Sequence, residues 1–126
     1  MKTILFSILL LFSINGVAHN WKKVAKNKDG SSFYIDVDNM KKHNRLVYFW
    51  ELSDFLEPLS GGVNSAISKY KVDCTEEKQT HLNLTFYSQS MSKGRILYEF
   101  SPNKIEYPKP KEIGYIVMKF ACDNAR

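Results

Sequence analysis

The sequence predicts an α+β fold, in which one C-terminal helix packs on a small antiparallel sheet of about five to six strands with a meander-like order. One basis is a pair of runs that alternate every two residues, 65–74 and 81–87, joined by the charged segment 75–79. This pattern is typical of an antiparallel hairpin with one buried face. The other is helical spacing of apolar residues near the C-terminus, at Ile113, Ile116, Val117, Phe120 and Ala121.

Residues 1–18 have the pattern of a secretory signal peptide. Lys2 precedes an apolar run of about ten residues, and small residues lead to a cleavage site after Ala18. The run is too short for a transmembrane helix, which needs about 20 apolar residues. A buried N-terminal helix is the alternative, but polar residues begin abruptly at His19. We therefore expect export and a single mature domain of residues 19–126.

The chain is basic, with a formal net charge of +5. Such a charge suits contact with acidic surfaces such as lipid head groups, glycans or nucleic acid. Export makes nucleic acid the least expected of these partners, and an ordinary soluble surface of mixed charge is the alternative. No later stretch is apolar enough for a transmembrane segment, and no cysteine follows the cleavage site to accept a lipid.

Cys74 and Cys122 are the two cysteines of the chain. In an exported domain, two cysteines most simply form a disulfide. A redox-active pair would normally be close in sequence, as in C-x-x-C, and this pair is not. We therefore predict a structural bridge that ties the C-terminal helix to the 65–87 hairpin.

The mature chain opens with a predicted hairpin. A first strand over 21–26 has Trp21 and Val24 as core residues, Asp29-Gly30 supplies the turn, and residues 31–36 return as the partner strand.

Residues 36–47 begin like a calcium-binding loop. Such a loop needs glycine at its sixth position and glutamate at its twelfth, where this chain has Lys41 and Val47. We therefore predict a capped helical turn over 37–42 in place of a metal site.

Residues 45–55 form the richest predicted strand. Leu46, Tyr48, Trp50 and Leu52 share one face, and Val47 and Phe49 begin the other. Apolar residues on both faces indicate a central strand that is covered on both sides. The following segment 57–64 contains Gly61-Gly62 and is predicted to be an exposed, mobile loop suited to recognition.

The C-terminal third completes the sheet and the helix. After the 65–87 hairpin, residues 88–94 are predicted to turn and 95–100 to form a short strand. Pro108 and Pro110 indicate an extended approach to the helix, which begins near Glu112 and carries Lys119 near its end.

The order of these segments resembles that of the surface-adhesin protein E-like domains of Gram-negative bacteria. The shared features are Trp21, the Asp29-Gly30 turn, the strand FYID at 33–36, the aromatic strand VYFWELSDF at 47–55, the serine-led strand ending in Cys74, the Tyr87, Met91 and Gly94 turn, and the helix ending on Cys122. The resemblance implies an exported sheet-and-helix domain that binds host proteins. The adhesin that names the family is a surface lipoprotein, whereas this chain lacks the lipid-accepting cysteine.

The residues do not form a catalytic motif. His19, His43 and His81 have no metal-ligand spacing to one another or to a cysteine, and each is predicted to be a surface histidine. Ser60-Gly61-Gly62 lacks the G-x-S-x-G context of a nucleophile elbow. No cofactor motif is present, and an unrecognised hydrolase is the least favoured function.

A binding protein is the favoured class, with Lys69 and Lys71 as the predicted ligand-binding residues. They share the outward face of the 65–74 strand and lie within a larger basic set that also includes Lys22, Lys26, Lys93 and Arg95. The expected ligands are a host extracellular-matrix protein or an anionic glycan. The alternative function is a periplasmic or envelope accessory protein that binds another bacterial protein, and the alternative role for the lysines is solubility of the sheet edge.

Overall fold

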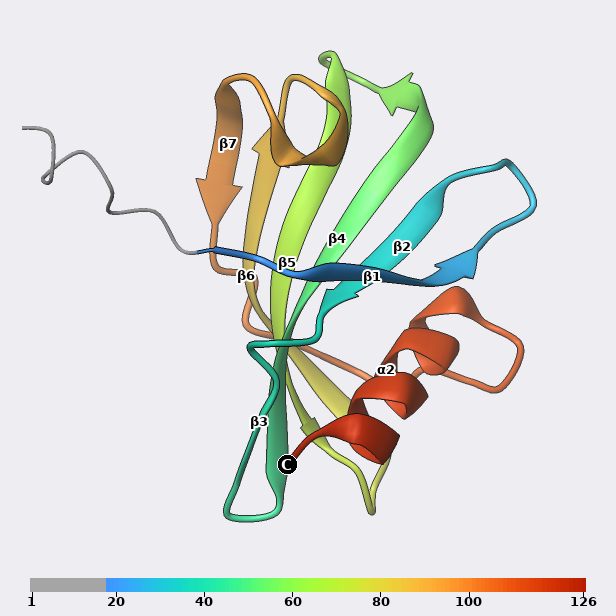
Figure 1. Cartoon of the computed structure of the whole chain (residues 1–126), viewed down its shortest axis with the longest axis vertical. Coiled ribbons are helices and arrows are strands. Elements are labelled where there is room, and N and C mark those ends of the chain that lie inside the picture. Colours follow the sequence, from blue (N-terminus) through green and yellow to red (C-terminus); the bar gives the residue numbers. More distant parts are fainter. Residues whose placement is uncertain (1–17) are drawn as a thin grey trace, which may run out of the picture.

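The computed structural model describes residues 18–126 as one antiparallel sheet with one long helix (Figure 1). The predicted signal peptide lies outside the described residues, except for Ala18. No helix in the described part of the chain is long and apolar enough to cross a membrane.

Six strands follow one another across the sheet in chain order. They are β1 (Trp21–Lys26), β2 (Ser32–Asp36), β4 (Leu46–Leu59), β5 (Val63–Asp73), β6 (Lys78–Tyr87) and β7 (Ile96–Phe100). Two short strands complete it, with β3 (Lys41–His43) paired to β4 and β8 (Lys104–Glu106) paired to β6. A 3₁₀ turn, η3 (Ser90–Ser92), precedes β7, and α2 (Ile113–Asn124) ends the chain. The predicted antiparallel meander with a C-terminal helix is confirmed.

The core lies between the sheet and α2. Val47 and Phe49 of β4 pair with Val72 and Tyr70 of β5, and these side chains pack with Ile35 against the helix. We call this side of the sheet the helix face. From α2, the buried side chains are Val117, Met118 and Ala121. Here one detail of the prediction is wrong, because Met118 is 1% exposed whereas Ile116 is 43% exposed.

The predicted helical turn over 37–42 is also wrong. Lys41, Lys42 and His43 instead form β3, opposite Tyr48, Val47 and Leu46 of β4. Asn44 and Arg45 make the connecting turn, with φ angles of 50° and 72°. Two consecutive residues with positive φ suit a tight hairpin, and the strand satisfies backbone groups that the edge of β4 would otherwise leave unpaired.

The predicted mobile loop over 57–64 is a hairpin tip. β4 continues to Leu59, which pairs with Val63 of β5, so the connection is only residues 60–62. Gly61 and Gly62 have φ angles of 79° and 77°, which only glycine adopts without strain. The glycines therefore serve a tight turn between two long strands.

The segment around η3 folds over one end of the other side of the sheet. Asp54 of β4 accepts hydrogen bonds from the Ser90 hydroxyl at 2.7 Å and from the Met91 backbone N–H at 2.9 Å. The Ser65 hydroxyl donates to the Gln89 carbonyl at 2.6 Å and accepts from the Ser92 N–H at 2.8 Å. This cover explains why Ser65 is fully buried although it lies on the side away from α2.

Candidate functional site

The side of the sheet opposite α2 carries a row of lysines and aromatic rings beyond the η3 cover. Trp50 of β4 pairs with Lys69 of β5, and Tyr48 pairs with both Lys71 of β5 and Lys41 of β3. Because alternate residues of a strand point to the same side, these five side chains share one surface. We call it the lysine face.

A groove of about 470 Å³ opens on this surface. Its lining includes Lys41, Lys42, His43, Lys69 and Arg126 together with Tyr48 and Trp50, and it contains no Asp or Glu. The Lys69 ammonium lies over the Trp50 ring, 5.1 Å from its centroid. A cation held on an aromatic face in this way keeps its charge available to an anion above it.

The two predicted ligand-binding lysines lie side by side but line different hollows. Lys69 lines the groove, whereas Lys71 lines an adjacent hollow with Lys78 and Asp73. The other members of the predicted basic set do not join them. Lys22 lies on the helix face, 5.6 Å from the centroid of the Phe120 ring, and Lys93 is exposed beside η3.

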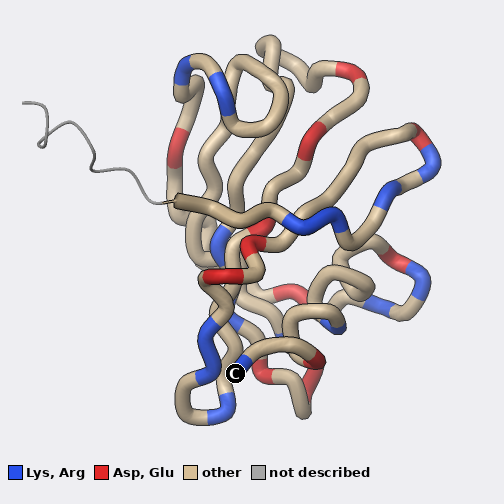
Figure 2. Tube along the Cα trace, in the orientation of Figure 1, with Lys and Arg blue, Asp and Glu red and all other residues tan. Residues whose placement is uncertain are grey.

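Three cationic residues of the groove, Lys41, Lys42 and Arg126, were missed by the sequence-based prediction. Lys41 reaches it because residues 41–43 form β3, and Arg126 reaches it because its carbonyl accepts a hydrogen bond from the Lys42 N–H at 3.2 Å. Figure 2 shows Lys and Arg residues along the β3 hairpin and beside the C-terminus. The sequence has no local pattern for this cluster, because Lys41, Lys69 and Arg126 lie 28 and 57 positions apart.

A buried carboxylate anchors the aromatic end of the lysine face. Asp36 at the end of β2 is fully buried and binds the His19 imidazole, the Asn20 N–H at 3.1 Å and the Asn39 side-chain amide at 2.7 Å. The His19 ring in turn stacks on Trp21, with centroids 4.6 Å apart, and meets Trp50 edge-on. Trp21 is therefore half-buried on the lysine face, whereas Val24 packs on the core as predicted.

Asp36→Asn should lower the free energy of unfolding by about 1–3 kcal/mol, because the buried donors around it would lose a charged acceptor. Burial raises the pKa of Asp36, but the hydrogen bonds from His19, Asn39 and the backbone outweigh it and hold the pKa below its usual 3.8. The carboxylate thus stabilises the fold above pH 3.8, and this contribution is lost as pH falls through its folded pKa. Urea titrations should show that the difference in free energy of unfolding between wild type and Asp36→Asn decreases as the pH falls below 3.8.

The exposed neighbour Asp38 provides the control, since Asp38→Asn removes a carboxylate from the same turn without removing a buried acceptor. If the difference in free energy of unfolding between wild type and Asp36→Asn stayed constant down to about pH 2, Asp36 would not be bound as an anion.

Of the three histidines, His19 and His81 have surroundings different from the predicted solvated surface. His43 is exposed, as predicted, and its Nε2 lies 3.2 Å from the Asn44 amide. His81 was predicted on a solvated face, but its ring stacks on Tyr70 with centroids 4.5 Å apart, and its Nε2 is buried without a hydrogen-bond partner. A bulge at Leu82 causes this, since Lys69 pairs with Asn83 and Tyr70 already with His81.

The described residues do not include a group of three or more His, Cys, Asp or Glu side chains placed to hold a metal ion. The groove also lacks a carboxylate that could serve as a general base beside its lysines and histidine. What its geometry favours is the binding of an anionic group against cations and aromatic rings.

Comparison with known proteins gives a family and a fold. The family model described as surface-adhesin protein E matches residues 21–123. Among solved structures, crystal form II of Haemophilus influenzae protein E is similar with a TM-score of 0.61 and 18% identity, over 86% of this chain and 91% of that one. Protein E from non-typeable Haemophilus influenzae is similar with a TM-score of 0.55 and 18% identity, over 87% of this chain and 80% of that one. No curated protein matches the chain.

Proposed function

The chain belongs to the surface-adhesin protein E family, and from this premise we propose that it is an exported, non-enzymatic binding protein with an adhesin-like role. Its partner is a host extracellular-matrix protein or an anionic glycan. The solved structures support the shared fold, and the ligand is inferred from the chemistry of the lysine face.

The observation that carries the proposal is the composition of the groove. Lysine, arginine and histidine side chains surround Tyr48 and Trp50, and no acidic residue lines the groove. Sulfate and carboxylate groups of a glycan, or an acidic patch of a protein, can meet the cations. The apolar face of a sugar or of a side chain can lie on the exposed part of the rings.

A double charge reversal, Lys69→Glu with Lys71→Glu, should weaken binding to heparin by up to roughly 30-fold. An exposed ion pair contributes about 0–1 kcal/mol, and two such contacts sum to at most about 2 kcal/mol, which converts to that factor. Added salt should reduce the difference in heparin affinity between wild type and the double variant. Salt screens exposed charges, and the Debye length is only about 8 Å at physiological ionic strength. Heparin-column elution and calorimetric titration at two salt concentrations measure both effects.

The matched control is Lys22→Glu with Lys26→Glu, which makes the same change of net charge on two exposed residues of β1. If the two double variants weaken binding equally, heparin senses only net charge and the groove is not the site. If only the lysine-face variant weakens it, the site is on that surface. A Trp50→Ala variant then measures the aromatic contribution.

The alternative, a periplasmic or envelope accessory protein that binds another bacterial protein, differs in location. An epitope that antibodies reach on intact cells supports the adhesin-like role. Release of the protein only by osmotic shock supports the periplasmic role, in which the same groove binds an acidic surface of another envelope component.

A further inference from the structure

The helix face contains a second cavity, of about 220 Å³, between β4, β5 and the segment that leads into α2. Its floor is formed by Glu51, Tyr70 and Gln79, which are 7%, 9% and 3% exposed. Its mouth is formed by Tyr107, which is 62% exposed, and by Glu112 at the start of α2. The cavity therefore has a buried polar floor and an opening to solvent, and it lies on the side of the sheet opposite the groove.

The cavity is acidic and has no counter-charge of its own. Glu51, Glu106 and Glu112 line it, and no Lys, Arg or His does. Glu106 accepts a hydrogen bond from the Gln79 amide at 3.1 Å, and Glu112 accepts one from the Lys109 backbone N–H at 2.8 Å. Neither of the ion pairs found among the described residues involves any of these three carboxylates.

Glu51 is the residue that points to a ligand. Its carboxyl group is more than nine-tenths buried at the floor, and the Tyr70 hydroxyl is the polar side chain beside it. Burial raises the pKa of Glu51 to about 7, the Tyr70 hydroxyl partly opposes this, and the charge of Glu106 adds to the rise. A buried charge that lacks a partner is costly, so an incoming cation that pairs with Glu51 would relieve that cost.

The size and walls of the cavity select the kind of cation. Liquid water occupies about 30 Å³ per molecule, so the cavity has room for several heavy atoms and not only for a bare ion. The exposed ring of Tyr107 at the mouth can lie beside a flat or alkylated cation. We propose that this cavity binds the ammonium or guanidinium head of an organic cation, with Glu51 as its counter-charge.

Two sources present this chemistry, a small free amine and the side chain of a lysine or arginine on a protein. The proposal is independent of the lysine face, which is proposed to bind anions and lies on the other side of the sheet. A protein with both sites could bind an acidic partner on one side and a cationic group on the other.

The experiment titrates the isotopically labelled protein with agmatine, which carries both an ammonium and a guanidinium group, and follows amide shifts by NMR at pH 8. Binding is expected to move the amide of Gly114 and the side-chain amide of Gln79, both of which line the cavity. A peptide with one arginine and blocked termini is the second arm. Tighter binding of the peptide identifies a protein side chain as the source, and binding of agmatine alone identifies a small molecule.

Glu51→Gln keeps the shape of the side chain and removes its charge, and it should weaken agmatine binding at least tenfold. Lowering the pH to 5.5 should weaken binding to wild type in the same direction, because a proton then competes for Glu51. The other titratable groups near the cavity are Glu106 of β8, Glu112, Tyr70 of β5, Tyr107 and His81 of β6. The variant isolates Glu51 from them, since its remaining pH dependence belongs to those groups.

Glu57→Gln removes one exposed carboxylate from the same strand, β4, so it is the matched control and should leave agmatine binding unchanged. Circular dichroism confirms that the Glu51→Gln variant is folded before it is titrated. The proposal is overturned if neither agmatine at about 10 mM nor the arginine peptide changes the chemical shifts of the Gly114 and Gln79 amides of wild type. It is also overturned if Glu51→Gln binds agmatine as tightly as wild type.

Discussion

Cys74→Ala combined with Cys122→Ala should lower the free energy of unfolding by about 4 kcal/mol. The bridge joins residues 48 positions apart, and the chain-entropy estimate for a closed loop of this length is about 4 kcal/mol. Since small domains have a total stability of about 5–15 kcal/mol, the loss is a large share of it. The thermal midpoint should fall by roughly 15–20 °C.

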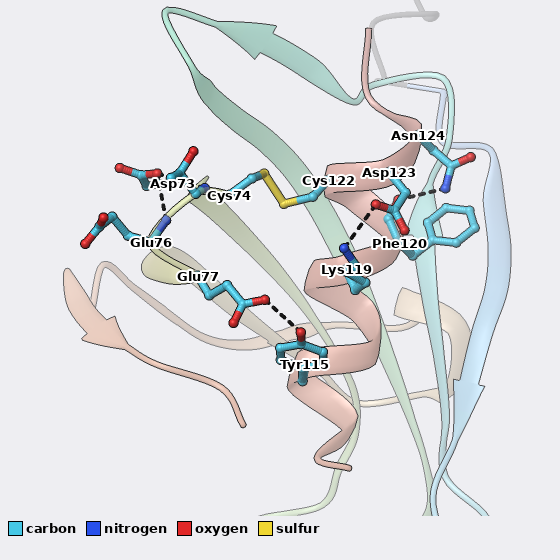
Figure 3. The surroundings of a disulfide bond; sticks show 11 residues. Asp73, Cys74, Glu76, Glu77, Tyr115, Lys119, Phe120, Cys122, Asp123 and Asn124 are labelled. Carbon is cyan, nitrogen blue, oxygen red and sulfur yellow. Dashed lines mark hydrogen bonds and ion pairs between the residues drawn. A yellow bond between two sulfur atoms is a disulfide. The ribbon is translucent and has the colours of Figure 1, made fainter. Parts of the chain in front are cut away.

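The remaining polar contacts along α2 cannot replace the bridge. Figure 3 shows the disulfide joining the last turn of the helix to the β5–β6 turn, with the Tyr115 hydroxyl donating to Glu77 at 2.7 Å. Lys119 and Asp123 form a pair at 3.5 Å whose side chains are more than half exposed. Exposed pairs of this kind contribute about 0.3–0.5 kcal/mol, so they are minor beside the cystine.

Thermal melts followed by far-UV circular dichroism measure the effect, and Lys119→Ala serves as a control that should shift the midpoint by no more than a few degrees. Reduction of wild type should reproduce the midpoint of the double variant, because both open the same loop. Intact mass after thiol alkylation confirms which state is melted. Equal midpoints for the oxidised wild type and the double variant would show that the bridge does not constrain the unfolded chain.

The strands could be predicted because their alternating pattern is local in the sequence, and the disulfide because two cysteines allow only one pairing. Alternation of polar and apolar residues marks β5, and an exported chain with two cysteines leaves one pairing. The helix could be predicted from the spacing of its apolar residues, but its predicted buried face was wrong in part. Met118 is buried in the core, whereas Ile116 is exposed. Methionine and isoleucine are both apolar, so composition alone cannot say whether Ile116 or Met118 faces the sheet.

The two cavities depended on register and could not be predicted in this way. Glu51 looked like the start of a polar face, yet pairing with Ser68 and proximity to Tyr70 bury it under the segment before α2. His81 changed sides through one extra residue, Leu82, since a bulge of one residue reverses the alternation beyond it. The outward position of Lys69 could be predicted because β5 is regular up to that residue. The position of Arg126 in the groove depends on the tertiary fold, so it could not be predicted from local sequence.

Glu51→Gln should stabilise the protein at pH 8 by an amount on the order of 3 kcal/mol relative to wild type. Burial, opposed in part by the Tyr70 hydroxyl and helped by the charge of Glu106, raises the pKa of Glu51 from 4.5 to about 7. Each pKa unit corresponds to about 1.4 kcal/mol. Between pH 4.5 and 7 the folded state holds a proton that the unfolded state has released, so the free energy of unfolding falls as pH rises through this window.

The sign of this effect separates Glu51 from His81, which also has a shifted pKa. Burial lowers the pKa of His81 from 6.5, so its contribution to stability is lost as pH falls, which is the opposite direction. Subtracting the pH profile of Glu51→Gln from that of wild type cancels the direct contribution of His81 and leaves that of Glu51, including its coupling to Glu106. Urea titrations from pH 4.5 to 8.5 supply both profiles, and Glu57→Gln, an exposed carboxylate of the same strand, is the control that should follow wild type. Parallel profiles for wild type and Glu51→Gln would mean that solvent in the cavity hydrates the carboxylate and that burial does not control its charge.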